Sequence, residues 1–144
     1  MKIYSFVSEK EYDQFGLDKN SNEHKFIKLI NPLGEDYSIM RTQLFSSMLS
    51  VMATNFNKGT ADMRLFEISK LFIPKEIPVT EQPEERKALC IGIMGEKEDF
   101  FTLKGMAEVV ADTLSIKFTY ERTTKTFLHP YQTAAIMYNG EEVG

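Results

Sequence analysis

The 144-residue chain contains no tryptophan and a single cysteine, Cys90. One thiol forms no disulfide within the chain and no cysteine-based zinc site, so this composition favours a protein of the reducing cytoplasm. Cys90 lies between Leu89 and Ile91, a position more typical of a small buried hydrophobic residue than of a nucleophile. The thiol is therefore not a candidate for catalysis.

Histidine is scarce as well: His24 lies in a polar stretch and His129 lies directly before Pro130. Neither has a second histidine, a cysteine or an acid at the spacing that metal ligands need, so we expect no metal site. A general base at His129 would need a partner that the neighbouring sequence does not supply. A structural or simply exposed histidine is the preferred interpretation.

An excess of positive charge and long apolar runs are also missing. The 17 Lys and Arg against 21 Asp and Glu give a formal net charge of -4, whereas proteins that hold nucleic acid by its phosphates usually carry a basic excess. No run approaches the length of a membrane span, and the first residues lack the apolar core of a signal peptide. We expect a soluble cytoplasmic protein that binds neither DNA nor a membrane.

Glycine-rich nucleotide motifs are absent. Neither the dinucleotide fingerprint nor the phosphate-loop lysine motif occurs. The stretch 95–105, GEKEDFFTLKG, has a glycine at each end and an interior Lys104, but its pattern indicates an ordinary loop and helix. We therefore expect no cofactor in this chain.

What is present is an ordinary globular composition, with 42% hydrophobic and 26% charged residues, at a length that suits one domain over residues 1–144. Apolar spacing predicts two long helices, over 42–58 and from a cap at Asp99 to Leu114. A brief helix is expected between a cap at Ser8 and a stop at Gly16.

The remaining pattern is that of strands. Apolar residues on both faces of the stretch 63–73 predict a central strand that is covered on both sides. The sum is an α+β fold, with a mainly antiparallel β-sheet flanked by helices. Strands are predicted at residues 2–8, 25–30, 63–73, 86–96 and 116–122, with a hairpin over 134–144 that turns at Asn139-Gly140.

The most chemically suggestive stretch is 31–42, NPLGEDYSIMRT, which gathers two acids, a tyrosine and an arginine. Asn31-Pro32 is typical of a strand end, and residues 34–38 of a tight connection in which Asp36 or Ser38 hydrogen-bonds locally. The stretch is therefore interpreted as a structural joint before a helix. Its Arg41 has Glu35, Asp36, Glu67 or a phosphate as possible partners, and a structural ion pair is preferred.

Glu67 is the acid in the least expected place, in mid-strand between Phe66 and Ile68. A carboxylate there either finds a hydrogen-bond donor or has a raised pKa. A ligand-binding role is possible for such an acid, but a satisfied structural hydrogen bond is preferred. The residues alone therefore do not identify the protein as an enzyme.

Seven blocks, in order, resemble the β chain of bacterial phenylalanyl-tRNA synthetase. The most specific are NPLGEDYSIMRT and RLFEISKLF, and DFFTLKG supports them. The blocks cover nearly the whole chain. They are YSFVS, NPLGEDYSIMRTQLFSSMLSVMATN, MRLFEISKLFIP, EERKALCIGIMG, DFFTLKGMAEVVADTL, FLHP and AAIMYNGEEVG.

This resemblance implies a class II aminoacyl-tRNA synthetase-like module that has lost catalysis and packs against the catalytic module of the α chain. It further implies that phenylalanine activation, with ATP and magnesium, and transfer to tRNA occur elsewhere in a heterotetramer. This chain is then expected to be a fragment of the β-chain core module, with no catalytic, cofactor-binding or metal-binding residues. Its contact with tRNA would come only through the whole enzyme.

Two departures from class II catalytic subunits bear on this expectation. There, the strand corresponding to RLFEISKLF runs into a loop whose arginine holds the ATP phosphate, whereas Phe72 is followed here by Ile73, Pro74 and Lys75. The missing arginine agrees with a loss of catalysis. Near the end, Tyr131-Gln132 follows LHP, where the family usually has Gly-Arg.

The expected role of this chain is structural: it supports assembly with the α chain. Because the apolar arc of the 42–58 helix is wider than one core needs, Phe45, Met48 and Met52 are the predicted interface residues. Two alternatives stay open: a free-standing synthetase paralogue that binds a small molecule or ATP near Glu67 and Arg41, and a tRNA-contacting module. The missing phosphate-binding arginine disfavours the first, and the net charge of -4 disfavours the second.

Overall fold

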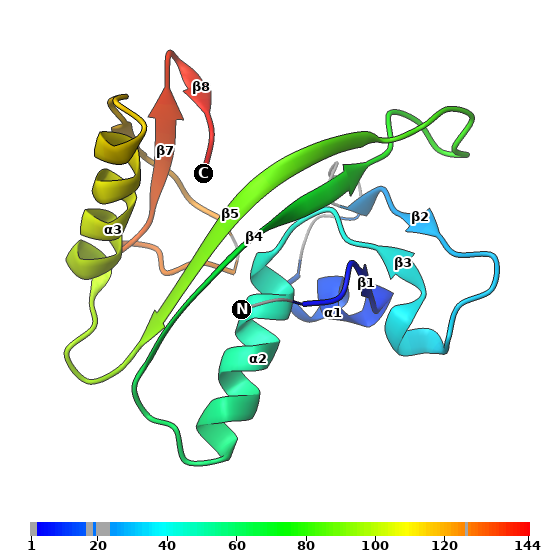
Figure 1. Cartoon of the computed structure of the whole chain (residues 1–144), viewed down its shortest axis with the longest axis horizontal. Coiled ribbons are helices and arrows are strands. Elements are labelled where there is room, and N and C mark those ends of the chain that lie inside the picture. The colour runs from blue at the N-terminus through cyan, green and yellow to red at the C-terminus, as the bar shows by residue number, and fades with distance from the viewer. Residues whose placement is uncertain (1–2, 17–18, 20–23, 126) are drawn as a thin grey trace. The chain divides into compact units, whose positions relative to one another are not determined.

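The computed structural model describes residues 3–16, 19, 24–125 and 127–144, and the chain forms two compact units, Met1–Met94 and Gly95–Gly144 (Figure 1). The single domain over 1–144 stays a prediction. The small antiparallel sheets and three helices are those of an α+β protein, as predicted.

Unit 1 begins with a small antiparallel sheet of order β1-β3-β2 and the helix α1. The helix starts as predicted, with Ser8 Oγ accepting a hydrogen bond from Lys10 N at 3.2 Å, and the chain turns away at Gly16, whose φ is 60°. The predicted strands 2–8 and 25–30 are each reduced to two residues. The elements are β1 (Phe6–Val7), α1 (Glu9–Gln14), β2 (Ile27–Lys28), the 3₁₀ turn η2 (Glu35–Tyr37) and β3 (Ile39–Met40).

Tyr12 is the centre of the core beside this sheet, which consists of Val7, Tyr12, Phe26 and Ile39. Its ring meets Phe26 edge-on, with centroids 4.6 Å apart. Its hydroxyl accepts a hydrogen bond from Thr42 N at 2.9 Å, while burial raises the pKa of Tyr12. The tyrosine thus ties α1 to the segment that leads into the next helix.

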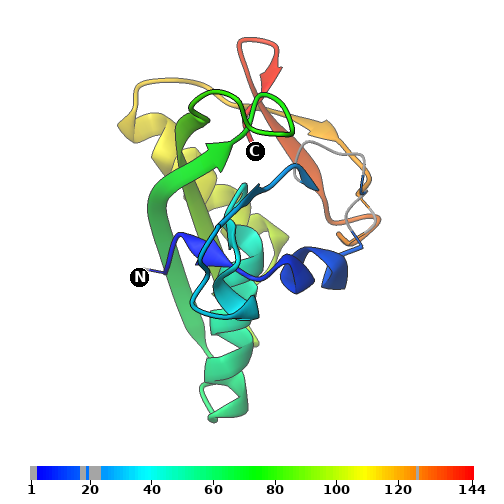
Figure 2. The same ribbon diagram turned by 90° about the vertical axis from the view of Figure 1, so that its right-hand side faces the viewer.

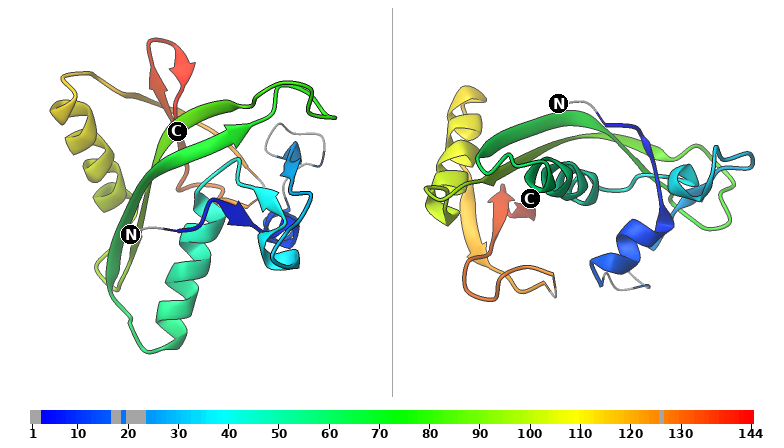
Figure 3. Two further views of the ribbon diagram at one scale, coloured as in Figure 1. Left: turned by 45° about the vertical axis from the view of Figure 1, so that its right-hand side comes forward. Right: turned by 90° about the horizontal axis from the view of Figure 1, so that it is seen from below.

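Helix α2 (Phe45–Asn57) starts three residues later than the predicted 42. Gln43 Oε1 accepts a hydrogen bond from Ser46 N at 3.0 Å, which satisfies a first-turn amide that would otherwise be unpaired. The helix lies against one face of the β4–β5 ribbon, seen end-on in the right panel of Figure 3. Met48 and Met52 face Gly92 there: a Cβ at that glycine would lie 2.6 Å from Met52 Sδ.

The long ribbon of unit 1 pairs β4 (Met63–Ile73) with β5 (Glu84–Met94) (Figure 2). Directly paired residues of antiparallel strands share a face, so Glu67 and Cys90 lie on the face with Gly92, and Phe66 and Ile91 lie on the other. On that other face, Phe66 is 59% exposed and Ile68 64% exposed. The prediction that this strand is covered on both sides is therefore wrong for this chain: in the described part of unit 1, α2 covers only one face.

Unit 2 contains α3 (Phe100–Thr113) and an antiparallel sheet of order β6-β7-β8. Asp99 Oδ1 accepts a hydrogen bond from Thr102 N at 2.7 Å, as expected of the cap, and this bond lowers the pKa of Asp99. The predicted hairpin turns at Asn139 and Gly140, with φ of 51° and 84°. The strands are β6 (Thr119–Arg122), β7 (Ala134–Tyr138) and β8 (Glu141–Glu142). Among the helices described, none has the length and apolar character to cross a membrane.

Candidate functional site

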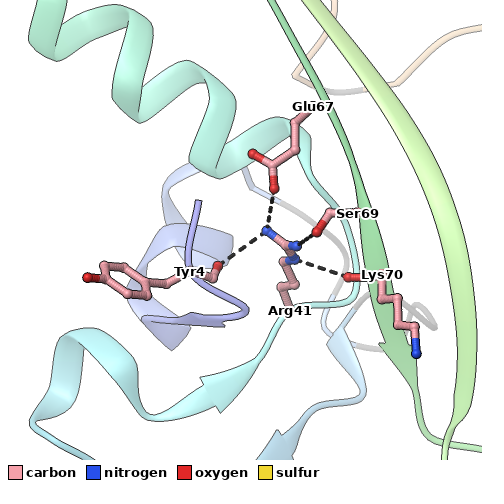
Figure 4. Close-up of polar contacts among 5 residues, drawn as sticks. All are labelled: Tyr4, Arg41, Glu67, Ser69 and Lys70. Carbon is pink, nitrogen blue, oxygen red and sulfur yellow. Dashed lines mark hydrogen bonds and ion pairs between the residues drawn. The ribbon is translucent and has the colours of Figure 1, made fainter. Parts of the chain in front are cut away.

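The side chain of Arg41 lies at the centre of a cluster of hydrogen bonds in unit 1 (Figure 4). Its Nη1 donates to Glu67 Oε1 at 3.0 Å and to the Tyr4 carbonyl at 3.2 Å. Its Nε donates to the Lys70 carbonyl at 3.1 Å, and its Nη2 donates to Ser69 Oγ. One side chain therefore holds together residue 4, the end of β3 and the middle of β4.

The backbone places Arg41 for this task from two sides. Its amide donates to the Ser5 carbonyl at 3.0 Å, and its carbonyl accepts from Phe72 N at 3.0 Å. The residue directly after β3 is thus anchored both to the segment that leads into β1 and to β4. This anchoring aims the guanidinium into the interior, toward Glu67.

The ion pair is sealed from solvent: Arg41 is 0% and Glu67 is 2% exposed. Two charges are stable in such a place only when geometry and further hydrogen bonds offset the loss of hydration. The guanidinium meets that condition with four hydrogen bonds. Glu67 Oε2 is buried with no hydrogen-bond partner among the described residues.

Cys90 lies opposite Glu67 in the register of β4 and β5. Burial, and secondarily the nearby Glu67 charge, raise the pKa of the Cys90 thiol from 9.0 to about 11. A nucleophilic cysteine needs a lowered pKa. The raised pKa argues against a nucleophile, as expected, but Cys90 is half-buried and not fully buried as predicted.

The contacts in this cluster stabilise the fold of the chain itself. The preferred interpretation of Arg41 as half of a structural ion pair is confirmed, and Glu67 is its partner. Glu35 pairs instead with Lys10 at 2.6 Å on the surface. The satisfied structural hydrogen bond expected of Glu67 is also confirmed, at Oε1.

The other candidates in the NPLGEDYSIMRT stretch are local surface features. Glu35 and Asp36 lie in the exposed turn η2. Ser38 Oγ donates to the Glu35 carbonyl at 2.9 Å, so the local hydrogen bond expected there is made by Ser38. The stretch is a joint, as predicted, but it also contains β3, which sequence reasoning missed.

Both histidines have structural surroundings. The His24 ring lies against Phe26, with centroids 5.1 Å apart. His129 Nδ1 accepts from the amides of Tyr131 and Gln132, each at 3.2 Å, which confirms its structural role in that turn. The described ranges hold no group of three His, Cys, Asp or Glu that could bind a metal ion.

The three predicted interface residues of α2 differ in their surroundings. Met48 is 2% and Met52 is 6% exposed, both beneath the β4–β5 ribbon, so within this chain they are core residues. Phe45 is half-buried, and its ring meets Phe15 edge-on at 5.3 Å. Their contact with a partner stays a prediction, and the exposed large apolar side chains of this helix are Leu49 and Phe56.

Taken together, fold and site define a small α+β protein whose buried charges hold its own segments together. The chain belongs to the family described as phenylalanyl tRNA synthetase beta chain CLM domain, whose model matches residues 1–144. It is similar to proteins named phenylalanine--tRNA ligase beta subunit, at 40% identity in Clostridium tetani and 39% in Clostridium acetobutylicum, over 98% of this chain in each case. A relative of the same name in Syntrophus aciditrophicus is 33% identical, over 98% of this chain. The chain spans 18% of the length of the two clostridial relatives.

Proposed function

We propose that this chain is a non-catalytic part of a phenylalanine–tRNA ligase, where it supports the assembly of the β subunit with the α subunit. The whole enzyme would charge tRNA with phenylalanine in the cytoplasm, using ATP and magnesium at sites outside this chain. In this proposal the α+β arrangement is a class II synthetase-like module. Support comes from the family and from relatives that carry the name beta subunit.

The observation that carries the proposal is the exposed apolar surface on the outer face of the β4–β5 ribbon. Phe66, Ile68 and Leu89 lie there side by side, 59%, 64% and 40% exposed. Burying side chains of this size contributes about 1.5–3 kcal/mol each, and a contiguous apolar patch is typical of an interaction site. The apolar pattern of this strand is that of one covered on both faces, so the α subunit is proposed to supply the second cover.

Helix α2 would form a second contact with the partner, on the opposite side of the ribbon from Phe66 and Ile68. This contact uses a different set of residues from the one first predicted. Leu49 is 45% and Phe56 is 57% exposed, so these two side chains are free to meet a partner. Met48 and Met52 then contribute to the interface indirectly, because their packing against Gly92 holds the helix in place on the ribbon. Phe45 has exposed surface left and stays in the proposal as a direct contact.

The polar cluster supports the non-catalytic part of the proposal. Arg41 is the cation that a phosphate near Glu67 would need, but it is buried and bound to four acceptors of its own chain. The alternative of a small-molecule or ATP site at these two residues has no geometric support. A tRNA-contacting role for this chain alone has no observation in its favour.

The test is assembly of the full-length β subunit, carrying Phe66→Asp and Ile68→Asp, with the α subunit, followed by sedimentation velocity. We expect the complex to dissociate at concentrations at which the unaltered complex stays intact. Phe101→Asp is the matched control, because Phe101 is 75% exposed and lies in unit 2. Circular dichroism of the free subunits checks that each variant is folded.

Unchanged assembly of the folded double variant would contradict the proposed interface. The non-catalytic part has its own readout, phenylalanine-dependent exchange between ATP and pyrophosphate. We expect none from the β subunit alone and full exchange when the α subunit is added. Robust exchange by the β subunit alone would show that catalysis resides there.

A further inference from the structure

A cavity of about 590 Å³ lies in unit 1, between β1, α1, η2 and α2. Its volume falls within the range of about 300–1,000 Å³ that is typical of small-molecule sites. One wall is a face of α2, where Ser47, Val51 and Thr54 follow at helical spacing. Of the Arg41 cluster, only Tyr4 also lines this cavity.

The charges around this cavity are unbalanced. Glu11 and Asp36 line it, and neither forms an ion pair with another described residue, although Glu11 Oε2 accepts from Ser46 Oγ at 3.2 Å. The lining cation, Lys10, is held by Glu35 with 2.6 Å between Nζ and Oε2. The electrostatic environment therefore favours a positively charged ligand over an anion.

Aromatic rings supply the second element of recognition. Tyr4 and Tyr37 line the cavity, and their rings meet edge-on with centroids 5.8 Å apart. They are 73% and 40% exposed, so ring surface is open to a ligand. An aromatic face beside carboxylates is a favourable place for an ammonium or guanidinium group.

Ser47 supplies a third, independent element. This residue lines the cavity and is only 4% exposed, yet its Oγ is buried with no hydrogen-bond partner among the described residues. Buried hydroxyls in folded proteins are nearly always hydrogen-bonded. A polar ligand atom in the cavity would give the Ser47 hydroxyl a hydrogen-bond partner.

We propose that this cavity binds a small organic cation, with its charged group between Glu11 and Asp36 and its apolar body against Tyr4 and Tyr37. The Ser47 hydroxyl would hydrogen-bond a polar atom of the same ligand. A bare metal ion is a poor fit, because the described residues offer no group of three metal-ligating side chains. The proposal does not depend on the assembly role.

Three probes of similar size test the proposal: benzylammonium, benzyl alcohol and benzoate, each titrated into the full-length protein that contains this chain. Saturation-transfer NMR detects binding, and calorimetry gives its strength. We expect benzylammonium to bind at least about tenfold more tightly than benzyl alcohol, and benzoate not to bind. This difference corresponds to one ion-pair interaction of modest strength.

The variant Glu11→Gln with Asp36→Asn keeps the shape of both side chains and removes their charge. We expect benzylammonium to bind this variant at least about tenfold more weakly, whereas Asp13→Asn, which alters an acid outside the cavity, leaves binding unchanged. Thermal unfolding confirms that both variants are folded. Equal binding of the three probes, no binding of benzylammonium, or unchanged binding by the double variant would each overturn the proposal.

Discussion

Arg41 and Glu67 are separated by 26 residues in sequence and meet in a fully buried ion pair, 3.0 Å from Nη1 to Oε1. Each of the two charges is stable in the interior because of the other. This mutual dependence makes the pair the most sensitive point of unit 1.

Replacing Arg41 by methionine is expected to destabilise unit 1 by about 3–5 kcal/mol, because it leaves the Glu67 carboxylate buried without a counter-charge. Hydrogen exchange of the β4 amides measures this loss locally in the full-length subunit. The double variant Arg41→Met with Glu67→Leu is expected to lose less than the single variant, since it leaves no buried charge. A double variant at least as unstable as the single one would contradict this explanation.

Two glycines are expected to respond in opposite directions to alanine. At Gly92 the new Cβ would lie 2.6 Å from Met52 Sδ and 3.1 Å from Met48 Cγ, so Gly92→Ala is expected to cost about 1–3 kcal/mol of unfolding free energy through overpacking. At Gly105, inside α3, nothing lies within 4 Å. Gly105→Ala is therefore expected to stabilise by about 0.5–1 kcal/mol, from helix propensity.

Denaturant unfolding of both alanine variants measures the two predicted changes in unfolding free energy. A stabilising Gly92→Ala would mean that the two methionines move aside freely. A destabilising Gly105→Ala in the isolated subunit would show that the helix needs the gap for a contact of its own.

The hairpin of unit 2 depends on its two turn residues. Gly140 has φ of 84°, which a β-branched residue adopts only with strain, so Gly140→Val is expected to cost about 1–3 kcal/mol and to release β8. Asn139→Gly, at a φ of 51°, is the control and should keep the turn. Amide exchange across the Met137–Glu142 pair reads out both variants.

Cys90 gives unit 1 a dependence on alkaline pH. Burial raises the pKa of the folded thiol to about 11, above its ordinary value of 9.0, so the folded state holds this proton more tightly than the unfolded state. The associated stability is complete below pH 9 and is lost as the pH rises toward 11. Comparison with Cys90→Ala between pH 7 and pH 11 measures it, and parallel pH curves for the two proteins would contradict it.

Alkylation is the second readout for Cys90. At pH 7.5 the raised pKa keeps the thiol protonated, so iodoacetamide is expected to react far more slowly with the folded protein than with the urea-unfolded chain. Equal rates would show that neither the partial burial nor the raised pKa of Cys90 protects the thiol in the folded protein.

Sequence patterns found the long elements of this protein because many residues repeat the same period. The strand predicted over 63–73 is β4 with the same bounds, and the Asp99 cap and the Asn139-Gly140 turn lie where they were predicted. The short sheet was beyond such reasoning. Its strands have two residues each, too few to show an alternation, and β3 exists because its neighbours pair with it.

In the candidate site, too, some features could be predicted from the sequence and others needed the structure. Sequence reasoning named Arg41 and Glu67 and preferred structural roles for both. The choice of Glu67 over Glu35 and Asp36 needed the long-range contacts between Arg41, directly after β3, and β4. The exposure of Phe66 was missed for a related reason. An apolar strand face looks alike in sequence whether its cover comes from the same chain or from another.

The bond from Arg41 to the Tyr4 carbonyl has a consequence for motion. Short segments outside regular secondary structure ordinarily open locally with little cost in free energy. Here residues 4 and 5 are bound to the same arginine that balances the buried Glu67 charge, so their release would weaken the hold on a charged group in the interior. Residues 4–5 and β4 are thereby expected to open as one cooperative unit, with matching hydrogen-exchange rates.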